Sequence, residues 1–342
     1  MLQKHVKLEF VYAEYMFRAK TICAILNRIP VLYFPRFDFI RLLDRLDSPD
    51  FVYFRFLLPD RYIIAFIKKL KKRYPKCKLI IEIPTFPYNR DAYVRWKTFM
   101  LFPREVFYRR FYKKYVDRFV TYSRDDEIFG VKTIPVMNGI DTERYKPMPG
   151  RTVNDEIRLL AVAFFQRHHG YERVLKGLYQ YYADCGKRKI RLIFAGEGTE
   201  LNKYMRLVKK YHLEDRVSYY GKLVGKKLDA IYDRSDIGLG PFGYYKIGLT
   251  EASSLKTREY LSKGLPLAAG CKQDVFPEGS KFFLEFPNNS SPVDVNRIVS
   301  FYDRLYGQES EESVAEDIHR IAVEKLSMDV TFKPVIDYLK EK

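Results

Sequence analysis

Residues 251–266 read Glu-Ala-Ser-Ser-Leu-Lys-Thr-Arg-Glu-Tyr-Leu-Ser-Lys-Gly-Leu-Pro, and this stretch predicts a short helix followed at once by a strand. Ser254 is a good N-cap, and Gly264 ends the helical pattern. The first amides of a helix have no partner within it, so such a start attracts anions, and Lys256 adds a mobile positive charge. Carboxylates at Glu251 and Glu259 suit hydroxyl groups. We therefore expect one ligand held at three points, a polyol, a diphosphate and a second polyol, which describes a nucleotide sugar.

Short apolar runs alternate with helical patterns on both sides of this stretch. Strands alternating with helices predict an α/β fold with parallel, doubly wound sheets. Two such Rossmann-like domains in tandem would place a ligand cleft between the carboxyl ends of their strands. The predicted strands are 51–56, 77–83, 118–123, 132–136, 157–165, 190–195, 217–220, 237–241, 265–269 and 282–286. The predicted helices are 60–74, 104–117, 171–184, 200–211, 228–234, 313–326 and 328–339.

The domain boundary is expected near residue 147. Asn138-Gly139-Ile140-Asp141 predicts a turn, and residues 146–151 are rich in Pro and Gly. We assign 1–147 to an acceptor-side domain, 148–326 to a nucleotide-sugar-binding domain, and 327–342 to a terminal helix that packs back toward the first domain. The first fifty residues show no Gly-rich turn after an opening strand, which leaves open that the chain is shortened at its N-terminus and catalytically silent.

The net charge of +18 is concentrated in the first part of the chain. Residues 1–150 hold 30 Lys and Arg against 16 Asp and Glu, a net of +14, and the remainder holds 31 against 27, a net of +4. This asymmetry favours an anionic surface as partner. The four cysteines are scattered without a Cys-x-x-Cys pair, which is typical of reduced thiols in a cytosolic protein. No signal peptide or apolar run near 18 residues is present.

Two basic segments of the first domain interleave charges with large apolar side chains. They are 60–74, which holds five Lys and Arg among its last seven residues, and 96–115, which begins at Trp96. Such segments resemble interfacial helices that bury aromatics among lipid headgroups. Packing of an ordinary helix with a solvated basic face is the alternative. A basic nucleic-acid-binding module is a second alternative, but no groove-reading or single-strand-binding motif supports it, so we expect no nucleic acid partner.

Four loops after predicted strands carry further candidate residues. Gly196-Glu197-Gly198 precedes a helix start that could bind an anion. The loop 167–173 holds paired histidines and Arg173, which could grip phosphate bidentately; we expect no metal there. Residues 243–248, with Lys246, fit a substrate-closing loop and equally a plain surface loop. The stretch 82–88, stiffened by two prolines, supplies Glu82, Thr85 and Tyr88 to the acceptor side, although Glu82 could equally be a structural carboxylate.

Together, the tandem Rossmann-like pattern, Asn-Gly-Ile-Asp, Gly-Glu-Gly and the two glutamates separated by seven residues resemble GT-B glycosyltransferases of family 4. The segment Leu255-Lys256-Thr257-Arg258-Glu259-Tyr260-Leu261 is similar to the branch that assembles bacterial surface polysaccharides such as capsule and exopolysaccharide. The resemblance implies that Glu259 binds the ribose and that Glu251 holds the transferred sugar and stabilises positive charge at its anomeric carbon. It also implies that the helix start after Ser254, with Leu255, Lys256 and Thr257, receives the diphosphate. The loop 221–225, with Lys222 and Leu223, would meet the base.

The sequence departs from the family pattern at two places. Phe164 and His169 stand where the family usually has Arg and Lys in the first loop of the second domain, so Arg173 is expected to supply the charge. Arg55 stands where the family has a histidine near the sugar. The resemblance implies retaining, metal-independent transfer of a hexose to a lipid-linked saccharide at the cytoplasmic face of the membrane. A sugar-nucleotide epimerase or an inverting transferase of the same fold remains the alternative.

Overall fold

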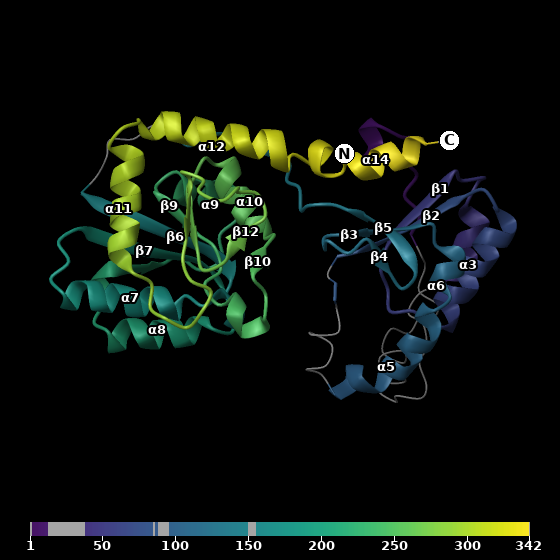
Figure 1. Ribbon diagram of the computed structural model, residues 1–342, viewed down its shortest axis with the longest axis horizontal. Helices are drawn as coiled ribbons and strands as arrows, with labels where there is room; N and C mark the ends of the chain where they lie inside the picture. The colour runs from purple at the N-terminus through teal and green to yellow at the C-terminus, as the bar shows by residue number, and fades with distance from the viewer. Residues whose placement is uncertain (1, 13–37, 85, 88–95, 150–154, 342) are drawn as a thin grey trace. The chain divides into compact units, whose positions relative to one another are not determined.

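The computed structural model describes residues 2–12, 38–84, 86, 87, 96–149 and 155–341, with the side chains of 96–102 left aside. The chain forms two compact units (Figure 1). Unit 1 comprises Met1–Met137 and Phe332–Lys342, and unit 2 comprises Asn138–Thr331. Each unit has its own sheet and its own apolar core, so the two are described separately.

Unit 1 is built on a five-stranded sheet in the order β1-β2-β3-β5-β4. The first four strands in this order are parallel, and β4 pairs antiparallel with β5 at the edge. The strands are β1 (Phe51–Arg55), β2 (Lys78–Ile83), β3 (Arg118–Thr121), β4 (Glu127–Ile128) and β5 (Val131–Pro135). The helices are α2 (Phe39–Leu42), α3 (Arg61–Arg73), α5 (Trp96–Arg109), α6 (Tyr112–Tyr115) and α14 (Lys333–Lys340).

Alternation along β2 divides the core of unit 1 between the two faces of its sheet. Leu79, Ile81 and Ile83 join the cluster that α3 completes, while Ile80 points to the other face and joins a cluster with Val335 of α14. Successive strand residues face opposite sides of the sheet, so the two clusters lie on opposite faces. Helix α3 covers one face, and α14 covers the other.

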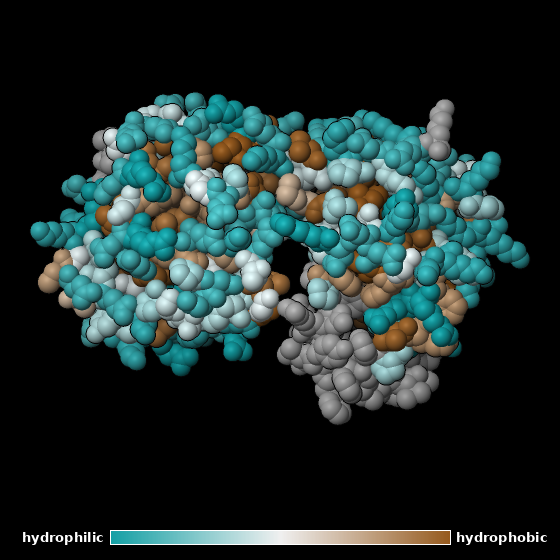
Figure 2. All heavy atoms as spheres, viewed as in Figure 1, coloured by the Kyte–Doolittle hydropathy of each residue, from teal (hydrophilic) through white to brown (hydrophobic). Residues whose placement is uncertain are grey.

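Figure 2 shows hydrophilic residues covering most of the visible surface, with hydrophobic ones interspersed.

The predicted helix 104–117 is wrong in its bounds. The structure has α5, which starts earlier and contains Pro103, and then the separate short helix α6. Arg110 and Phe111 separate the two helices. Asp117, the last residue of the predicted helix, lies outside both, and its carboxylate accepts from Lys71 Nζ at 2.5 Å and from the amide of Leu79 at 2.6 Å. That tie fixes where the chain leaves α6 for β3.

The boundary between the units lies at Met137/Asn138 rather than at residue 147. Asn138–Asp141 forms no turn: Ile140 makes a parallel bridge with Ser327, and its amide donates to the carbonyl of Leu326 at 2.8 Å. A Cβ at Gly139 would lie 2.2 Å from Thr331 Oγ1 and 3.1 Å from Met328 Cα. Gly139 therefore serves close packing between two chain segments, not a turn conformation.

Unit 2 is built on a six-stranded parallel sheet in the order β13-β11-β9-β6-β7-β8. Every strand predicted for this part of the chain is present, with somewhat different ends. The strands are β6 (Glu156–Phe164), β7 (Lys189–Glu197), β8 (Val217–Tyr219), β9 (Ile237–Leu239), β11 (Leu267–Ala269) and β13 (Phe283–Glu285). A separate parallel pair is formed by β10 (Glu251–Ala252) and β12 (Lys272–Gln273).

Helices cover both faces of the unit 2 sheet. The larger core cluster joins the sheet to α7, α8, α11 and α12, and the smaller one joins it to α9 and α10. The helices are α7 (Glu172–Ala183), α8 (Leu201–Lys210), α9 (Lys226–Tyr232), α10 (Leu255–Ser262), α11 (Val295–Tyr306), α12 (Glu311–Leu326) and α13 (Met328–Thr331). The sequence reading missed α11, and the predicted helix 328–339 is two helices, α13 in unit 2 and α14 in unit 1.

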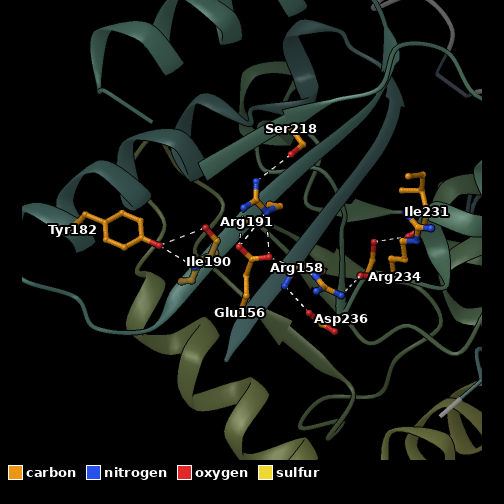
Figure 3. Close-up of polar contacts among 10 residues, drawn as sticks. Glu156, Arg158, Tyr182, Ile190, Arg191, Ser218, Ile231, Arg234 and Asp236 are labelled. Carbon is orange, nitrogen blue, oxygen red and sulfur yellow. Dashed lines mark hydrogen bonds and ion pairs between the residues drawn. The ribbon is translucent and has the colours of Figure 1, made fainter. Parts of the chain in front are cut away.

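A polar network joins the amino ends of the central strands in unit 2 (Figure 3). Arg191 Nε donates to both oxygens of Glu156 at 3.1 Å, and Arg191 Nη1 donates to Ser218 Oγ at 3.4 Å. The amide of Arg158 donates to Asp236 Oδ2 at 2.6 Å. Burial opposes ionisation of Glu156, but hydrogen bonds and charge from Arg191 and Arg158 lower its pKa overall. The network stabilises the side of the sheet at which the strands begin, opposite their carboxyl ends.

Candidate functional site

The strand order of unit 2 predicts where a ligand would bind. In that order β6 lies between β9 and β7, so the connections that leave the carboxyl ends of β6 and β9 run in opposite directions. A crevice forms at such a switch point in open α/β sheets and commonly binds a ligand. The loop after β6 contains η4 (Arg167–His169), and the loop after β9 contains η6 (Tyr244–Ile247).

These two loops pack directly on each other. Gly170 has φ +66°, and a Cβ there would lie 2.5 Å from the amide nitrogen of Gly243. Lys246 Nζ pairs with the Glu172 carboxylate and donates to the carbonyl of Arg167 at 3.1 Å. The side chain of Lys246 is 11% exposed. Lys246 therefore joins the two loops, and its contact with the donor stays a prediction.

The start of α10 has the geometry predicted for an anion site. Ser254 caps the helix: its Oγ accepts from the Thr257 amide at 3.4 Å. The amides of Leu255 and Lys256 precede the first intrahelical hydrogen bond and so need other partners. The side chain of Leu255 is exposed, whereas the hydroxyl of Thr257 is buried and donates to Gln273 Oε1 at 3.1 Å. The Thr257 amide donates to the carbonyl and Oγ of Ser254, so both polar donors of Thr257 already have partners within the protein.

Lys256 projects from this helix start toward the loop after β6. Its Nζ lies 3.3 Å from the hydroxyl oxygen of Tyr171, and that hydroxyl donates in turn to the carbonyl of Leu239 at 3.0 Å. None of the ion pairs found among the described residues involves Lys256. Burial lowers the pKa of Lys256 to about 7, and the Cys271 thiol opposes that shift only in part. A half-buried ammonium beside orphan helix amides is an arrangement that suits an anion.

His169 lines the same region as a neutral side chain. Its ring stacks on Tyr171 with centroids 5.9 Å apart, and its Nδ1 accepts from the Gln166 amide at 2.9 Å. Burial, reinforced by Lys256 and His168, lowers the pKa of His169 to about 2. With Nδ1 as an acceptor, the proton resides on Nε2, which leaves a neutral donor. Within the described chain, no three or more His, Cys, Asp or Glu side chains gather as a metal site.

Arg173 is a structural residue, which corrects its assignment as a phosphate ligand. It is only 3% exposed. Its Nε donates to the carbonyl of Ser291 at 2.6 Å, Nη1 to that of Phe242 at 2.7 Å and Nη2 to that of Pro287 at 2.9 Å. The first turn of α7 points this side chain into the core, where all three guanidinium nitrogens are occupied. Arg173 thus braces two loops, the one after β9 and the one between β13 and α11, and cannot replace the charge that the first loop lacks.

Glu259 lies one turn into α10, between two tyrosines. Tyr232 Oη donates to Glu259 Oε2 at 2.8 Å. Burial, reinforced by the charge of this carboxylate, raises the pKa of Tyr145 to about 12. The Tyr232 hydroxyl orients the Glu259 carboxylate and leaves it acceptor capacity for further hydroxyl groups. Sequence reasoning missed Tyr145, Tyr171 and Tyr232, because tyrosines spread over 28 positions carry no motif.

Glu251 lies in β10 and is half-buried. Its strand pairs with β12 in register with Lys272, outside the main sheet. Glu251 and Glu259 therefore flank the α10 start, one before the cap and one after the first turn. Glu251, Ser254, Lys256 and Glu259 thus lie on one continuous stretch that runs from β10 into α10.

The glycines of Gly196-Glu197-Gly198 allow close packing against the backbone of β6 and the residues after it; their ligand contact stays a prediction. A Cβ at Gly196 would lie 1.9 Å from the carbonyl oxygen of Ala163, and one at Gly198 would lie 2.3 Å from the amide of Phe165. Both have φ near +140° to +150°, which disfavours any side chain. Glu197 is exposed beside Lys222, 3.9 Å away. Leu223 packs partly against the smaller core cluster.

In unit 1 the candidate acceptor residues are held mainly by tyrosines. Glu82 accepts from Tyr53 Oη at 2.8 Å and from Tyr122 Oη at 3.3 Å. Burial and this carboxylate raise the pKa of Tyr122 to about 12. Glu82 is therefore a structural carboxylate, with tyrosines rather than an arginine as partners. Arg55 is exposed at the end of β1, and Thr85 and Tyr88 lie outside the described residues.

Part of unit 2 is similar to a known protein family. Residues 147–275, fewer than half of the chain, match the family model described as Glycosyl transferases group 1. This segment contains the α10 start and both glutamates. No curated protein matches the sequence significantly.

Solved structures similar to this chain include a protein described as a glycosyltransferase, and the sequence identities are low. A glycosyltransferase from Rickettsia africae is 13% identical, with a TM-score of 0.60 over 96% of this chain and 83% of that one. Anabaena Alr3699/HepE in complex with UDP is also 13% identical, with a TM-score of 0.62 over 88% and 81%. Sucrose-phosphate synthase from Thermosynechococcus elongatus is 15% identical, with a TM-score of 0.56 over 94% and 78%. These likenesses confirm the predicted α/β fold of the GT-B class.

Proposed function

We propose that the protein is a retaining glycosyltransferase that moves a hexose from a nucleotide sugar to a glycan acceptor. The observation that carries this proposal is the α10 start, where Lys256 and orphan amides lie between Glu251 and Glu259. The group 1 match over residues 147–275 supports it, as does the Anabaena structure, which is described with UDP.

In this proposal the chain stabilises the leaving group electrostatically. The diphosphate would accept from the amides of Leu255 and Lys256 and pair with the Lys256 ammonium, in place of a divalent cation. Groups aimed at developing negative charge in a water-poor site supply a large part of the catalysis in such reactions. Glu251 would hold hydroxyls of the sugar and stabilise positive charge at the anomeric carbon, and Glu259, oriented by Tyr232, would accept from the ribose.

We also propose that unit 1 binds an anionic membrane surface and there meets a lipid-linked acceptor in cell-surface polysaccharide synthesis at the cytoplasmic face. The support is the basic charge near α5, where Asp60 and Glu105 are each 3% exposed and Arg110 is exposed. Arg104 lies 3.4 Å from Asp60, and Arg109 lies 3.5 Å from Glu105. These two acids are thus buried against arginines, and Arg110 adds exposed positive charge beside them.

Apolar side chains accompany this basic charge. Leu57, Leu58 and Phe107 are each more than 40% exposed, and the Arg110 guanidinium lies 3.8 Å from the centroid of the Phe107 ring. Tyr112 Oη lies 3.4 Å from the carbonyl of Leu57, which ties that loop to α6. Each basic residue near an anionic bilayer contributes about 1 kcal/mol to binding. No helix of the described chain is both long and apolar enough to cross a bilayer.

The donor proposal is tested by thermal shift and calorimetry against UDP, GDP, ADP, CDP and dTDP and their hexose conjugates. We expect stabilisation by one base class, and a labelled donor should then yield a product with the donor's anomeric configuration by NMR. Inversion would indicate an inverting transferase, and a changed sugar with no acceptor product would indicate an epimerase. Absence of any shift would contradict the proposal and favour a silent homologue.

The membrane proposal is tested by sedimentation with phosphatidylglycerol vesicles and with phosphatidylcholine vesicles. We expect binding to the anionic vesicles alone, weakened at least fivefold by Arg110→Glu and Phe107→Ser together. Lys210→Glu, on an exposed position of α8, is the matched control and should bind as the wild type does. Equal binding to both lipids, or an equal effect of the control, would contradict the proposal.

A further inference from the structure

Arg258 has the largest side chain that is fully buried in the described part of the chain, at 0% exposure. Taking a guanidinium out of water costs several kcal/mol unless hydrogen bonds satisfy it. Its Nη2 donates to Asp274 Oδ2 at 2.5 Å and to Ser253 Oγ at 3.1 Å, and its Nε donates to the carbonyl of Asn138 at 3.0 Å. Only one of these three acceptors is a carboxylate.

Ser253 also forms a hydrogen bond with Asn138. The Asn138 side-chain amide donates to the carbonyl of Ser253 at 2.7 Å, with the amide orientation assigned from this contact. The hydroxyl and the carbonyl of Ser253 are therefore both held, one by Arg258 and one by Asn138. Ser253 stands between Glu251 in β10 and the N-cap Ser254, so fixing it fixes the spacing between the carboxylate and the helix start.

The hydrogen bonds from Arg258 and Asn138 to Ser253, here called the clamp, also involve the residue at which the chain enters unit 2. Asn138 is the first residue of that unit, and its carbonyl is the acceptor for Arg258 Nε. Asp274, the carboxylate partner, directly follows β12, the strand paired with β10, and its amide donates to the carbonyl of Ala252 at 3.2 Å. Three separate segments thus hold the residues that precede the α10 start.

We propose that Arg258 and Asn138 are positioning residues of the donor site, which clamp Ser253 and so hold Glu251 at a fixed distance from the α10 amides. The proposal rests on the proposed nucleotide-sugar function. Neither residue touches the ligand; each acts through Ser253. A site that binds a sugar and a diphosphate at once loses affinity when the segment between its two contacts becomes mobile. Part of the binding free energy is then lost to ordering that segment.

The test measures by calorimetry the affinity for UDP, GDP, ADP, CDP and dTDP and for their hexose conjugates, together with thermal unfolding of each variant. Ser253→Ala should weaken binding of the preferred nucleotide sugar about tenfold, the effect of having to order about one freed residue on binding. Ser253→Thr, which keeps the hydroxyl, should restore the affinity to within about threefold of the wild type. Ser262→Ala, at the far end of α10, is the control, because its buried hydroxyl has no hydrogen-bond partner in the described structure. It should leave affinity unchanged.

A double variant, Arg258→Met with Asp274→Asn, removes both charges and so leaves no buried charge unpaired. In that background Ser253→Ala should weaken binding by less than about twofold, because the group that holds the hydroxyl is already gone. A tenfold effect of Ser253→Ala in both backgrounds would overturn the proposal, as would wild-type affinity in Ser253→Ala. If the wild type binds a nucleotide but the variants do not behave as stated, only the positioning role of Arg258 and Asn138 is wrong. If the wild type binds none of the panel, both the proposed function and this positioning role are wrong. Should the double variant not fold, the comparison of Ser253→Ala, Ser253→Thr and Ser262→Ala still decides.

Discussion

Replacing Lys256 by methionine should change the pH dependence of donor affinity and of folding stability in opposite directions. Burial lowers the pKa of this ammonium to about 7, whereas a lysine in the unfolded chain titrates near pH 10.4. The charged form falls from about nine tenths at pH 6 to about one tenth at pH 8. If the diphosphate binds only that form, wild-type affinity should fall about tenfold over this range.

The stability effect has the opposite sign. Between pH 7 and about 10.4 the unfolded chain binds more protons at Lys256 than the folded chain does, so stability rises with pH. From pH 7 to pH 8 the gain is about 1 kcal/mol, and the limiting slope is about 1.4 kcal/mol per pH unit. Below pH 7 both states are charged, and this contribution is constant. His169 does not add to the signal, because its pKa of about 2 keeps it neutral throughout.

The assay is calorimetry of the preferred nucleotide sugar at pH 6.0, 7.0 and 8.0, in two buffers of different ionisation enthalpy at each pH. At pH 8.0 the wild type should take up about 0.9 proton per ligand bound, and at pH 6.0 about 0.1. Lys256→Met should bind more weakly, without this uptake, and its urea-unfolding free energy should lack the rise above pH 7. The matched control is Lys209→Met on the exposed end of α8. Wild-type affinity that is flat from pH 6 to pH 8, with no proton uptake, would refute the assignment of Lys256 as the diphosphate ligand.

Three other substitutions test separate parts of the structure. Arg173→Met leaves three backbone carbonyls without their donor, so it should lower the free energy of unfolding in urea by about 3–5 kcal/mol. Arg167→Met, which changes an exposed side chain, is the control. An equal loss of stability in both variants would contradict the structural role of Arg173. Gly139→Ala should cost about 1–3 kcal/mol by overpacking, and Thr331→Ala should relieve part of that cost; strictly additive losses would show that the two do not collide. Glu259→Gln should weaken nucleotide binding about tenfold or more in calorimetry with little change in stability, and unchanged affinity would remove the ribose assignment.

The elements that sequence reasoning located well are those with a local cause. The Ser254 cap, the end of α10 before Gly264 and the apolar strands on either side depend on residues close to one another in the chain, so periodicity and capping chemistry suffice to place them. Because α10 and its cap are local, the candidate site built on residues 251–259 was also readable before the fold was known.

Side-chain direction was not readable in this way. Arg173 and Lys256 are both basic residues near helix starts, and the sequence offers no reason to treat them differently. The packing of α7 turns Arg173 into three backbone carbonyls, while the helix start of α10 leaves Lys256 beside a tyrosine hydroxyl. Which cation is satisfied internally depends on carbonyls and hydroxyls that are more than 60 residues away in sequence.

The sequence by itself determined two α/β units with parallel sheets and the capped helix within residues 251–266. Those features follow from strand alternation and helix capping, which are properties of short segments. Only the tertiary structure decided that Arg258 and Asn138 hold Ser253, that Tyr232 orients Glu259, and that Gly196 and Gly198 pack closely against neighbouring backbone. The physical reason is that a polar or small residue acquires its role from the groups that the fold brings to it, and these come from distant segments.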